Sequence, residues 1–184
     1  MFNHLKTALL MMIILTLLTG LVYPFAITFL AQVIFPYQAN GSLIIHDKKI
    51  IGSKLIGQNF TSDKYFHSRP SEVNYEANKS GGSNFGPTNK KLIEKVRLNV
   101  EKLKRENLNL SVPADLVTSS ASGLDPHISV EAALFQVLRV AKARGISEGK
   151  IKELVSKHIE PRQFGILGEP RVNVLILNLA LDNL

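Results

Sequence analysis

The sequence contains no cysteine, and its five histidines are scattered along the chain. Without cysteine the chain can form neither a disulfide framework, nor a thiolate nucleophile, nor a cysteine-based zinc site. No two histidines lie at i and i+4, the spacing that places two imidazoles on one helix face, so the sequence gives no specific support for a metal site.

Charge is also missing from the first part of the chain. No acidic or basic residue lies between Lys6 and Asp47, and residues 7–35 form an uncharged, largely apolar run. A bilayer core needs only ~20 helical residues, so this run predicts one transmembrane helix. A cleaved signal peptide is the alternative, but its apolar region should span only ~7–15 residues and end at a small-residue cleavage site, which we do not find.

Three residues inside the run are candidates for packing against partner helices. Thr16 and Gly20 lie four residues apart, a spacing that lets two membrane helices approach closely. Pro24 predicts a kink one turn later, because its ring clashes with the carbonyl of residue 20. A plain anchor with incidental Gly and Pro is the alternative. Basic residues flank both ends of the run, so charge alone does not orient it.

The formal net charge of +7 suggests nucleic acid or anionic lipid as a partner, but its distribution does not. Between residues 89 and 107 the basic side chains alternate with glutamates, as on the solvated face of a helix. Two helices across residues 129–158 loosely resemble a helix-turn-helix, for which an ordinary helical hairpin is the simpler interpretation. We expect membrane lipid and no nucleic acid among the partners.

The rest of the chain predicts a soluble domain over residues 37–184, after a membrane segment over residues 1–36. Segments 42–45 and 49–51 indicate a hairpin. Residues 57–87 are rich in Gly, Ser, Asn and Pro but keep aromatic side chains, which indicates a long ordered loop. Helices are expected over residues 89–106 with Thr88 as N-cap, over 130–144, after Ser147, and over 171–181 as a buried helix rather than a strand. The fold class is therefore α+β, with three or four helices, a small sheet and long ordered loops.

The sequence contains no complete motif for phosphate chemistry. Gly52 and Gly57 have the spacing of a Walker A loop, but Gln58 and Asn59 stand where lysine and Ser/Thr are required. The Asp-Lys-Thr-Gly-Thr sequence is also absent, so the chain cannot form an aspartyl-phosphate by that route. No catalytic residue is assigned on these grounds.

A loop containing Ser122, Asp125 and His127 raises the alternative of a membrane-tethered extracytoplasmic hydrolase. However, the Gly-x-Ser-x-Gly nucleophile elbow is absent. These short polar side chains also suit a turn that is fixed by Pro126. We favour turn and capping chemistry and keep the hydrolase as the alternative.

Several short sequence motifs follow one another along the chain: Gly52-Ser-x-Leu-Ile-Gly-Gln58, Arg69-Pro-Ser71, Ser80-Gly-Gly-Ser-Asn84, Ser122-Gly-Leu-Asp-Pro-His-Ile-Ser129, Gln136 with Arg139-Val-Ala141, and Gly168-Glu-Pro-Arg-Val-Asn-Val-Leu175. In this order, after one N-terminal span, they resemble the C subunit (KdpC) family of the bacterial Kdp potassium-transporting P-type ATPase. The resemblance covers nearly the whole chain.

The resemblance implies a non-catalytic, single-pass subunit of a high-affinity potassium uptake complex in the bacterial inner membrane. Its implied partners are a channel-like potassium-translocating subunit and a P-type ATPase subunit. It also implies a catalytic chaperone that raises the ATP affinity of the hydrolysing subunit, with ATP as a ligand of a ternary complex and Gln136 as a candidate nucleotide contact. The family's soluble domain is usually placed outside the cytoplasm, which conflicts with a role in binding cytoplasmic ATP. We give the topology more weight.

The other motif residues are expected to be structural or to contact partners: Gly57, Gln58, Arg69, Pro70, Gly81, Gly82, Ser83, Asn84, Ser122, Gly123, Asp125, Pro126, His127, Arg139 and Asn173.

Overall fold

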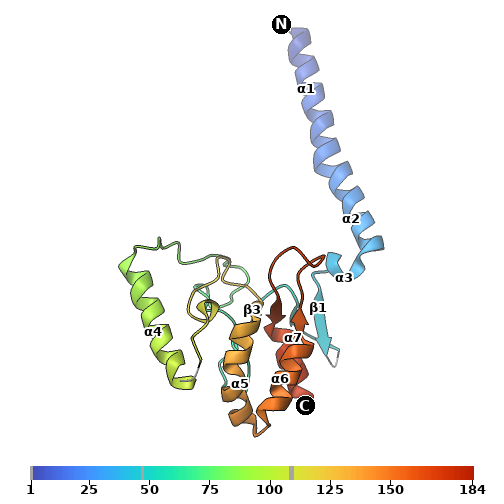
Figure 1. Cartoon of the computed structure of the whole chain (residues 1–184). Helices are drawn as coiled ribbons and strands as arrows, with labels where there is room; N and C mark the ends of the chain where they lie inside the picture. Colours follow the sequence, from blue (N-terminus) through green and yellow to red (C-terminus); the bar gives the residue numbers. More distant parts are fainter. Residues whose placement is uncertain (1, 47, 108–109) are drawn as a thin grey trace. The chain divides into compact units, whose positions relative to one another are not determined.

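A computed structural model describes residues 2–46, 48–107 and 110–184. The chain forms two compact units, Met1–Ile51 and Gly52–Leu184. The predicted α+β fold class is confirmed, because one long apolar helix is followed by helices and two small sheets (Figure 1). The long helix ends at Ile34, two residues before the predicted boundary after residue 36, and as a domain boundary that position stays a prediction.

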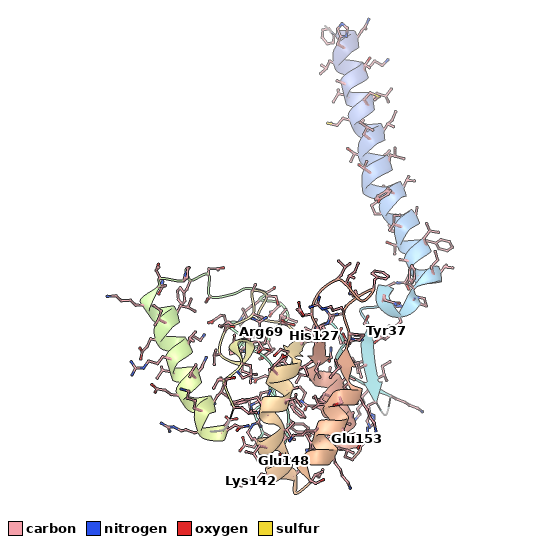
Figure 2. The ribbon with its side chains drawn as sticks, in the orientation of Figure 1. Tyr37, Arg69, His127, Lys142, Glu148 and Glu153 are labelled. Atoms are coloured by element: carbon pink, nitrogen blue, oxygen red, sulfur yellow. The ribbon has the colours of Figure 1, made fainter. Side chains whose placement is uncertain are left out.

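The first unit begins with a continuous helix. Helix α1 (Phe2–Leu17) passes through a π-helical turn at Leu18–Val22 into α2 (Tyr23–Ile34). The 33 residues of Phe2–Ile34 have a mean hydropathy of 2.2 in their most apolar window, and none of that window is buried. Their side chains project on all sides (Figure 2). By length and composition this helix can cross a membrane, as the sequence predicts.

The π-helical turn ends at Val22, two residues before Pro24. The Tyr23 N–H donates to the carbonyl of Leu18, five residues back. A π-helical turn is one of the local adjustments by which a membrane helix accommodates proline. The effect of Pro24 is therefore a widened turn inside an unbroken helix.

A short helix and a hairpin follow. Helix α3 (Pro36–Ala39) leads to β1 (Leu43–His46) and β2 (Lys49–Ser53), which form a two-stranded sheet. The predicted hairpin is confirmed, although Asp47 of its turn lies outside the described residues. Lys48 has a φ of 63°, the left-handed conformation that tight turns require.

The second unit is built around a three-stranded antiparallel sheet in the order β3-β5-β4. Its strands are β3 (His127–Ser129), β4 (Ile159–Glu160) and β5 (Arg171–Asn173). Val172 in the central strand β5 lies opposite Ile128 of β3 and Ile159 of β4. The hydrophobic core joins this sheet to the helices, and its largest fully buried apolar side chains are Phe66, Phe135, Ile128, Ile151, Leu177 and Leu181.

Helices α5 (Val130–Arg144) and α6 (Glu148–Lys157) form the predicted helical hairpin. The Ser129 hydroxyl oxygen caps α5 by accepting from the Ala132 N–H at 3.0 Å. Gly145 ends α5 at a φ of +68°, which glycine adopts without steric penalty.

The predicted helix over residues 171–181 is wrong at its start. Residues 171–173 form β5, and α7 (Val174–Asp182) begins only after Asn173. The Asn173 side chain accepts from the Ile176 N–H at 3.2 Å and caps this helix. The sheet therefore takes the first three residues because Val172 is buried between two neighbouring strands.

Helix α4 (Lys90–Glu106) is confirmed, but its cap is Asn89 rather than Thr88. The Asn89 side chain accepts from the Lys91 N–H at 2.9 Å, which a threonine one residue earlier is not placed to do. A 3₁₀ turn at Ala114–Leu116 follows, within the loop before β3. Four α-helices, α4 to α7, thus lie in the described part of the second unit.

Candidate functional site

Loops that the sequence motifs single out meet backbone to backbone in the second unit. The Gly57 N–H donates to the carbonyl of Leu124 at 2.8 Å, and the Gly81 N–H donates to the carbonyl of Ser122 at 2.9 Å. We call this meeting of residues 57, 81–82 and 120–125 the loop junction. It turns three irregular segments into one hydrogen-bonded structure, although neither sheet includes them.

Close backbone approach explains two of the glycines. A Cβ on Gly57 would lie 2.6 Å from the carbonyl oxygen of Asp125, and one on Gly82 would lie 3.0 Å from that of Ala121. Neither glycine has a positive φ, so the close approach, and not a left-handed turn, explains why glycine stands there. Gly123 does fit it, with a φ of +69°.

Arg69 and Asp125 form the charged edge of the loop junction. The Arg69 Nη1 lies 3.2 Å from the Asp125 Oδ2, and the other carboxylate oxygen accepts from the His127 N–H at 3.0 Å. Burial opposes ionisation of Asp125, but hydrogen bonds from His127 and the charge of Arg69 hold the pKa of this carboxyl below its usual value. The Tyr75 hydroxyl donates to the Arg69 carbonyl, and burial raises the pKa of Tyr75 to about 12.

His127 lies between two carboxylates. Its Nδ1 is 3.7 Å from Asp125 Oδ1, and its Nε2 is 3.5 Å from Glu160 Oε2. Glu160 also lies 2.8 Å from the Lys54 amine and 3.2 Å from the Arg171 guanidinium. Burial raises the pKa of Glu160, but hydrogen bonds from Lys54 and Arg171 outweigh it and hold the pKa below its usual value. This cluster ties β3, β4 and β5 together.

In the loop of Ser122, Asp125 and His127, the Ser122 and Asp125 side chains bond to nearby backbone groups. The Ser122 hydroxyl oxygen accepts from the Leu124 N–H at 3.1 Å, and Asp125 accepts from the His127 N–H. Within residues 48–107 and 110–184, no hydrogen bond joins Ser122 to His127. The observed roles are those of turn and capping chemistry.

Gln136 on α5 is buried, and its amide is fully hydrogen-bonded. Its Oε1 accepts from the His67 N–H at 2.7 Å and from the Arg139 Nη2 at 2.7 Å. Its Nε2 donates to the carbonyls of His67 and Ala132 at 3.1 and 3.2 Å. A primary amide has two donor hydrogens and two acceptor lone pairs, so this set uses its full capacity.

Asn178 on α7 pairs in the same way with Phe66, the loop residue just before His67. Its Oδ1 accepts from the Phe66 N–H, and its Nδ2 donates to the Phe66 carbonyl, both at 2.9 Å. Two side-chain amides therefore satisfy the peptide groups of two consecutive loop residues, as a neighbouring strand would. We call Gln136 and Asn178 the amide pair.

Arg139 extends this network to three segments. Its Nη1 donates to the carbonyls of Asp63 and Tyr65 at 2.9 and 3.0 Å, and its Nε lies 3.1 Å from a carboxylate oxygen of Glu106 on α4. Burial and the nearby Arg139 charge lower the pKa of His67. Arg139 is thus a tie between α5, α4 and the long loop.

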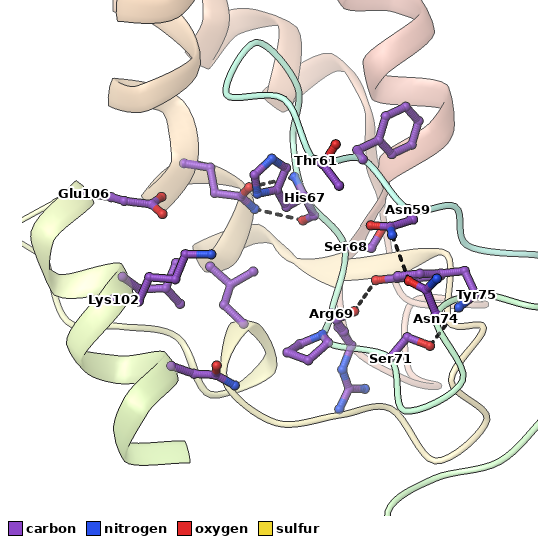
Figure 3. Close-up of a pocket in the computed structure, with 16 residues that line it drawn as sticks. Asn59, Thr61, His67, Ser68, Arg69, Ser71, Asn74, Tyr75, Lys102 and Glu106 are labelled. Atoms are coloured by element: carbon purple, nitrogen blue, oxygen red, sulfur yellow. Dashed lines mark hydrogen bonds between the residues drawn. The ribbon is translucent and has the colours of Figure 1, made fainter. Parts of the chain in front are cut away.

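A polar cavity of about 400 Å³ lies between α4 and the loop of residues 59–75 (Figure 3). Its lining includes the predicted residues Arg69, Pro70 and Gln136, together with Lys102 and Asn74. Among the residues that the structure describes, no group of three or more His, Asp or Glu side chains could hold a metal ion.

The remaining predicted residues occupy separate positions. The Pro70 carbonyl accepts from the Ser120 N–H at 3.2 Å, and the Pro126 carbonyl accepts from the Val174 N–H at 2.9 Å. Asn173 donates from Nδ2 to the carbonyl of Lys54 at 2.8 Å, besides capping α7. Three others lie in loops: Gln58 packs beside Gly52, Ser83 accepts from the Phe85 N–H, and Asn84 has a φ of 54°.

The predicted residues for packing against partner helices, Thr16, Gly20 and Pro24, lie on the apolar helix of the first unit.

Two residues of these networks, Asn178 and Glu160, were not among the site residues predicted from the sequence. Asn178 had a signal, because it is the one polar residue within the apolar stretch 174–181, and a buried amide needs partners. Glu160 had none, because one cationic partner, Lys54, lies far away in the sequence and the other, Arg171, lies on a neighbouring strand.

The chain is similar to a set of known proteins over its whole length. Residues 5–183 match the family model KdpC, described as the c chain of the K+-transporting ATPase. The potassium-transporting ATPase KdpC subunit of Rhodopseudomonas palustris (strain BisB18) is 59% identical, over 99% of this chain and 98% of the relative. The subunits of the same name from Bradyrhizobium diazoefficiens and Methylobacterium nodulans are 54% and 52% identical, over 99% and 100% of this chain and 98% of each relative.

Proposed function

Because the chain belongs to the KdpC family and is thus a subunit of a K+-transporting ATPase, we propose that it is a non-catalytic accessory subunit of an ATP-driven potassium uptake complex. The proposed partners are the potassium-translocating subunit and the P-type ATPase subunit, in a bacterial inner membrane. The observation that carries the proposal is the helix Phe2–Ile34, which is long enough to span a bilayer and buries none of its most apolar window within the chain.

An architectural role for the second unit is supported by how its polar side chains are used. The hydrogen bonds of Gln136, Asn178 and Asp125 go largely to backbone groups of the same unit. Such groups hold loops in place rather than reacting with a substrate. We infer that the second unit rests on the extracytoplasmic entrance of the translocating subunit and that the apolar helix fixes it there.

Co-purification tests the assignment. A C-terminally tagged chain would be isolated in detergent from membranes of potassium-starved cells, and the proteins recovered with it identified by mass spectrometry. Recovery of both partner subunits is expected. A second strain that lacks residues 37–184 but keeps the helix should lose complex assembly or high-affinity potassium uptake. Recovery of the tagged chain alone, or normal uptake after the deletion, would refute the accessory role.

The orientation can be tested cleanly because the natural sequence has no cysteine. Lys157→Cys on the exposed face of α6 should react with a membrane-impermeant maleimide in intact cells. Asn3→Cys, at the other end of the apolar helix, should react only after permeabilisation. The reverse labelling pattern would place the second unit in the cytoplasm.

A role as a catalytic chaperone that raises ATP affinity is a second candidate. The polar cavity supports it, because Gln136, Lys102 and Arg69 line the same space of about 400 Å³. A photoreactive ATP analogue added to the purified complex should then label this chain near Lys102, and Lys102→Gln should reduce the labelling. If the analogue labels only the ATPase subunit, this chain has no contact with nucleotide.

A further inference from the structure

Helix α4 carries most of the positive charge of the second unit. Seven basic and three acidic residues lie in its 17 positions, which gives it a formal charge of +4. The rest of the unit, residues 52–89 and 107–184, holds twelve basic and eleven acidic residues. Charge is therefore nearly balanced everywhere in this unit except on α4.

Helix α4 lies at the edge of the second unit (Figure 1). None of its residues is buried, and Leu103 packs against the core from its inner face. Ten of its side chains are exposed, of which six are basic, two acidic and two apolar: Lys90, Lys91, Ile93, Glu94, Arg97, Leu98, Glu101, Lys102, Lys104 and Arg105. Such a mixture of cations and apolar side chains is typical of helices that lie on a membrane surface.

The glutamates of α4 leave most of its cations unpaired. Glu101 accepts from the Arg97 Nε at 3.1 Å, and Glu106 lies 3.1 Å from the Arg139 Nε of α5. Lys95 bonds to a glutamate of the long loop. Within residues 48–107 and 110–184, the structure shows no ion pair for the other five cations of the helix: Lys90, Lys91, Lys102, Lys104 and Arg105.

The kind of cation distinguishes a membrane surface from a protein as the partner. Four of the five unpaired side chains are lysines. Protein interfaces are depleted in lysine and enriched in arginine, whose planar guanidinium binds a carboxylate through two hydrogen bonds. Clustered lysines are instead typical of segments that bind anionic lipid headgroups. The helix Phe2–Ile34, which can cross a membrane, would also keep the same chain close to a lipid surface.

We propose that α4 binds the anionic headgroups of the bilayer in which the apolar helix is anchored. Its unpaired cations contact the headgroup phosphates, and Ile93 and Leu98, each 56% exposed, enter the interface beside them. This inference rests on the part of the proposed function that places the chain in a membrane, and it does not depend on which subunits are its partners. Because the attraction is between charges at a surface, salt weakens it.

A single fluorescent label tests the contact, since the natural sequence has no cysteine. Leu98→Cys in the full-length chain would carry the fluorophore, and the chain would be reconstituted into nanodiscs whose lipids bear a quencher at the headgroup. Quenching is expected in nanodiscs rich in phosphatidylglycerol and not in nanodiscs of phosphatidylcholine alone. It should be lost at ~1 M salt, where charges are screened beyond ~3 Å. A label at Lys157→Cys on α6 should be quenched equally in both lipids.

Removal of charge from α4 is the second arm of the test. Three lysines would be replaced together: Lys90→Gln, Lys91→Gln and Lys104→Gln. The ratio of lipid-bound to free α4 should then fall by at least about tenfold. The matched control removes three exposed lysines from α6 and should leave that ratio unchanged: Lys150→Gln, Lys152→Gln and Lys157→Gln. Lys102, which lines the polar cavity, is kept in both variants, and thermal unfolding of each in detergent should match the unsubstituted chain.

The outcomes separate this proposal from the proposed function. Quenching at position 98 that is absent from both kinds of nanodisc, or equal in both, would overturn the lipid contact. So would a triple α4 variant that keeps the quenching but recovers fewer partner subunits, because the helix would then bind an acidic protein surface. The accessory role fails separately, if the unsubstituted chain recovers no partner subunit.

Discussion

The side-chain amide of Gln136 pairs with both polar groups of the His67 peptide backbone, its Oε1 accepting from the N–H at 2.7 Å and its Nε2 donating to the carbonyl at 3.1 Å. Asn178 pairs with Phe66 in the same way. The amide pair thus gives an irregular loop the satisfied backbone of a strand. A nucleotide contact by Gln136 stays a prediction, and it would require some of these bonds to break.

Gln136→Ala should destabilise the chain by roughly 2–4 kcal/mol, because it leaves the half-buried His67 peptide groups and Arg139 Nη2 without this partner. Urea unfolding of the full chain in detergent, without nucleotide, would measure the effect. Gln163→Ala, at an exposed glutamine, should change stability by less than about 0.5 kcal/mol. If Gln136→Ala unfolds like the unsubstituted chain, the structural role of this amide is refuted.

Gly57→Ala should destabilise by about 1–3 kcal/mol, because the new methyl group would lie 2.6 Å from the backbone carbonyl of Asp125 and force the loop junction apart. Gly81→Ala is the matched control, since nothing lies within 4 Å of its added Cβ. The same unfolding measurement applies to both. Equal effects of the two substitutions would contradict the close approach at Gly57.

Acid should weaken the fold through Glu160 and Asp125. The pKa of each carboxyl is held below its ordinary value of 4.5 or 3.8, so the folded state favours the ionised form. This contribution is fully present above the ordinary pKa values and is lost as pH falls below about 4.5 and then through the folded pKa values. Each group adds a slope of at most ~1.4 kcal/mol per pH unit.

Glu160→Gln tests the assignment of this pH dependence. Compared with the unsubstituted chain, this variant should have a lower free energy of unfolding at pH 7. That free energy should also decline less steeply as the pH is lowered from 7 to 3. Glu94→Gln, on the exposed face of α4, removes one carboxylate outside the His127 cluster and should keep the steep decline. An unchanged slope for Glu160→Gln would remove Glu160 from the account.

Gly20→Leu should reduce the recovery of partner subunits without affecting the chain alone. Nothing in the chain lies within 4 Å of a Cβ at Gly20, whereas a partner helix could approach closely only at a small residue. Ala8→Leu adds similar bulk at another point of the same helix and serves as the control. Co-purification in detergent measures both variants, and an equal yield for Gly20→Leu and the unsubstituted chain would argue against helix packing at this site.

Local sequence patterns predicted the elements that depend on local chemistry. The uncharged run gave the long helix, and Ser129 with Gly145 marked both ends of α5. The start of α7 was misplaced because the largely apolar segment 172–177 suits a buried helix and a central strand equally well. Only the pairing of Val172 with Ile128 and Ile159 decides between them, and that pairing is tertiary.

The candidate site was harder to predict because its contacts join distant segments. The motif strings named Gly57, Arg69, Asp125, Gln136 and Arg139, but spacing could not show which would meet. The loop junction joins residues 57 and 124, and the Gln136 amide reaches a residue 69 positions away. Nor could spacing show that Gly57 allows two backbones to approach.

The Asn178–Phe66 contact spans 112 residues of chain, which sets the order of events during synthesis. At roughly 5–20 residues per second, a ribosome needs about 6–22 s to travel from one residue to the other. Throughout that interval the nascent loop has no Asn178 amide to satisfy the peptide group of Phe66. These backbone groups can be satisfied by Asn178 only once α7 has been made, so completing this part of the loop is a late step of folding.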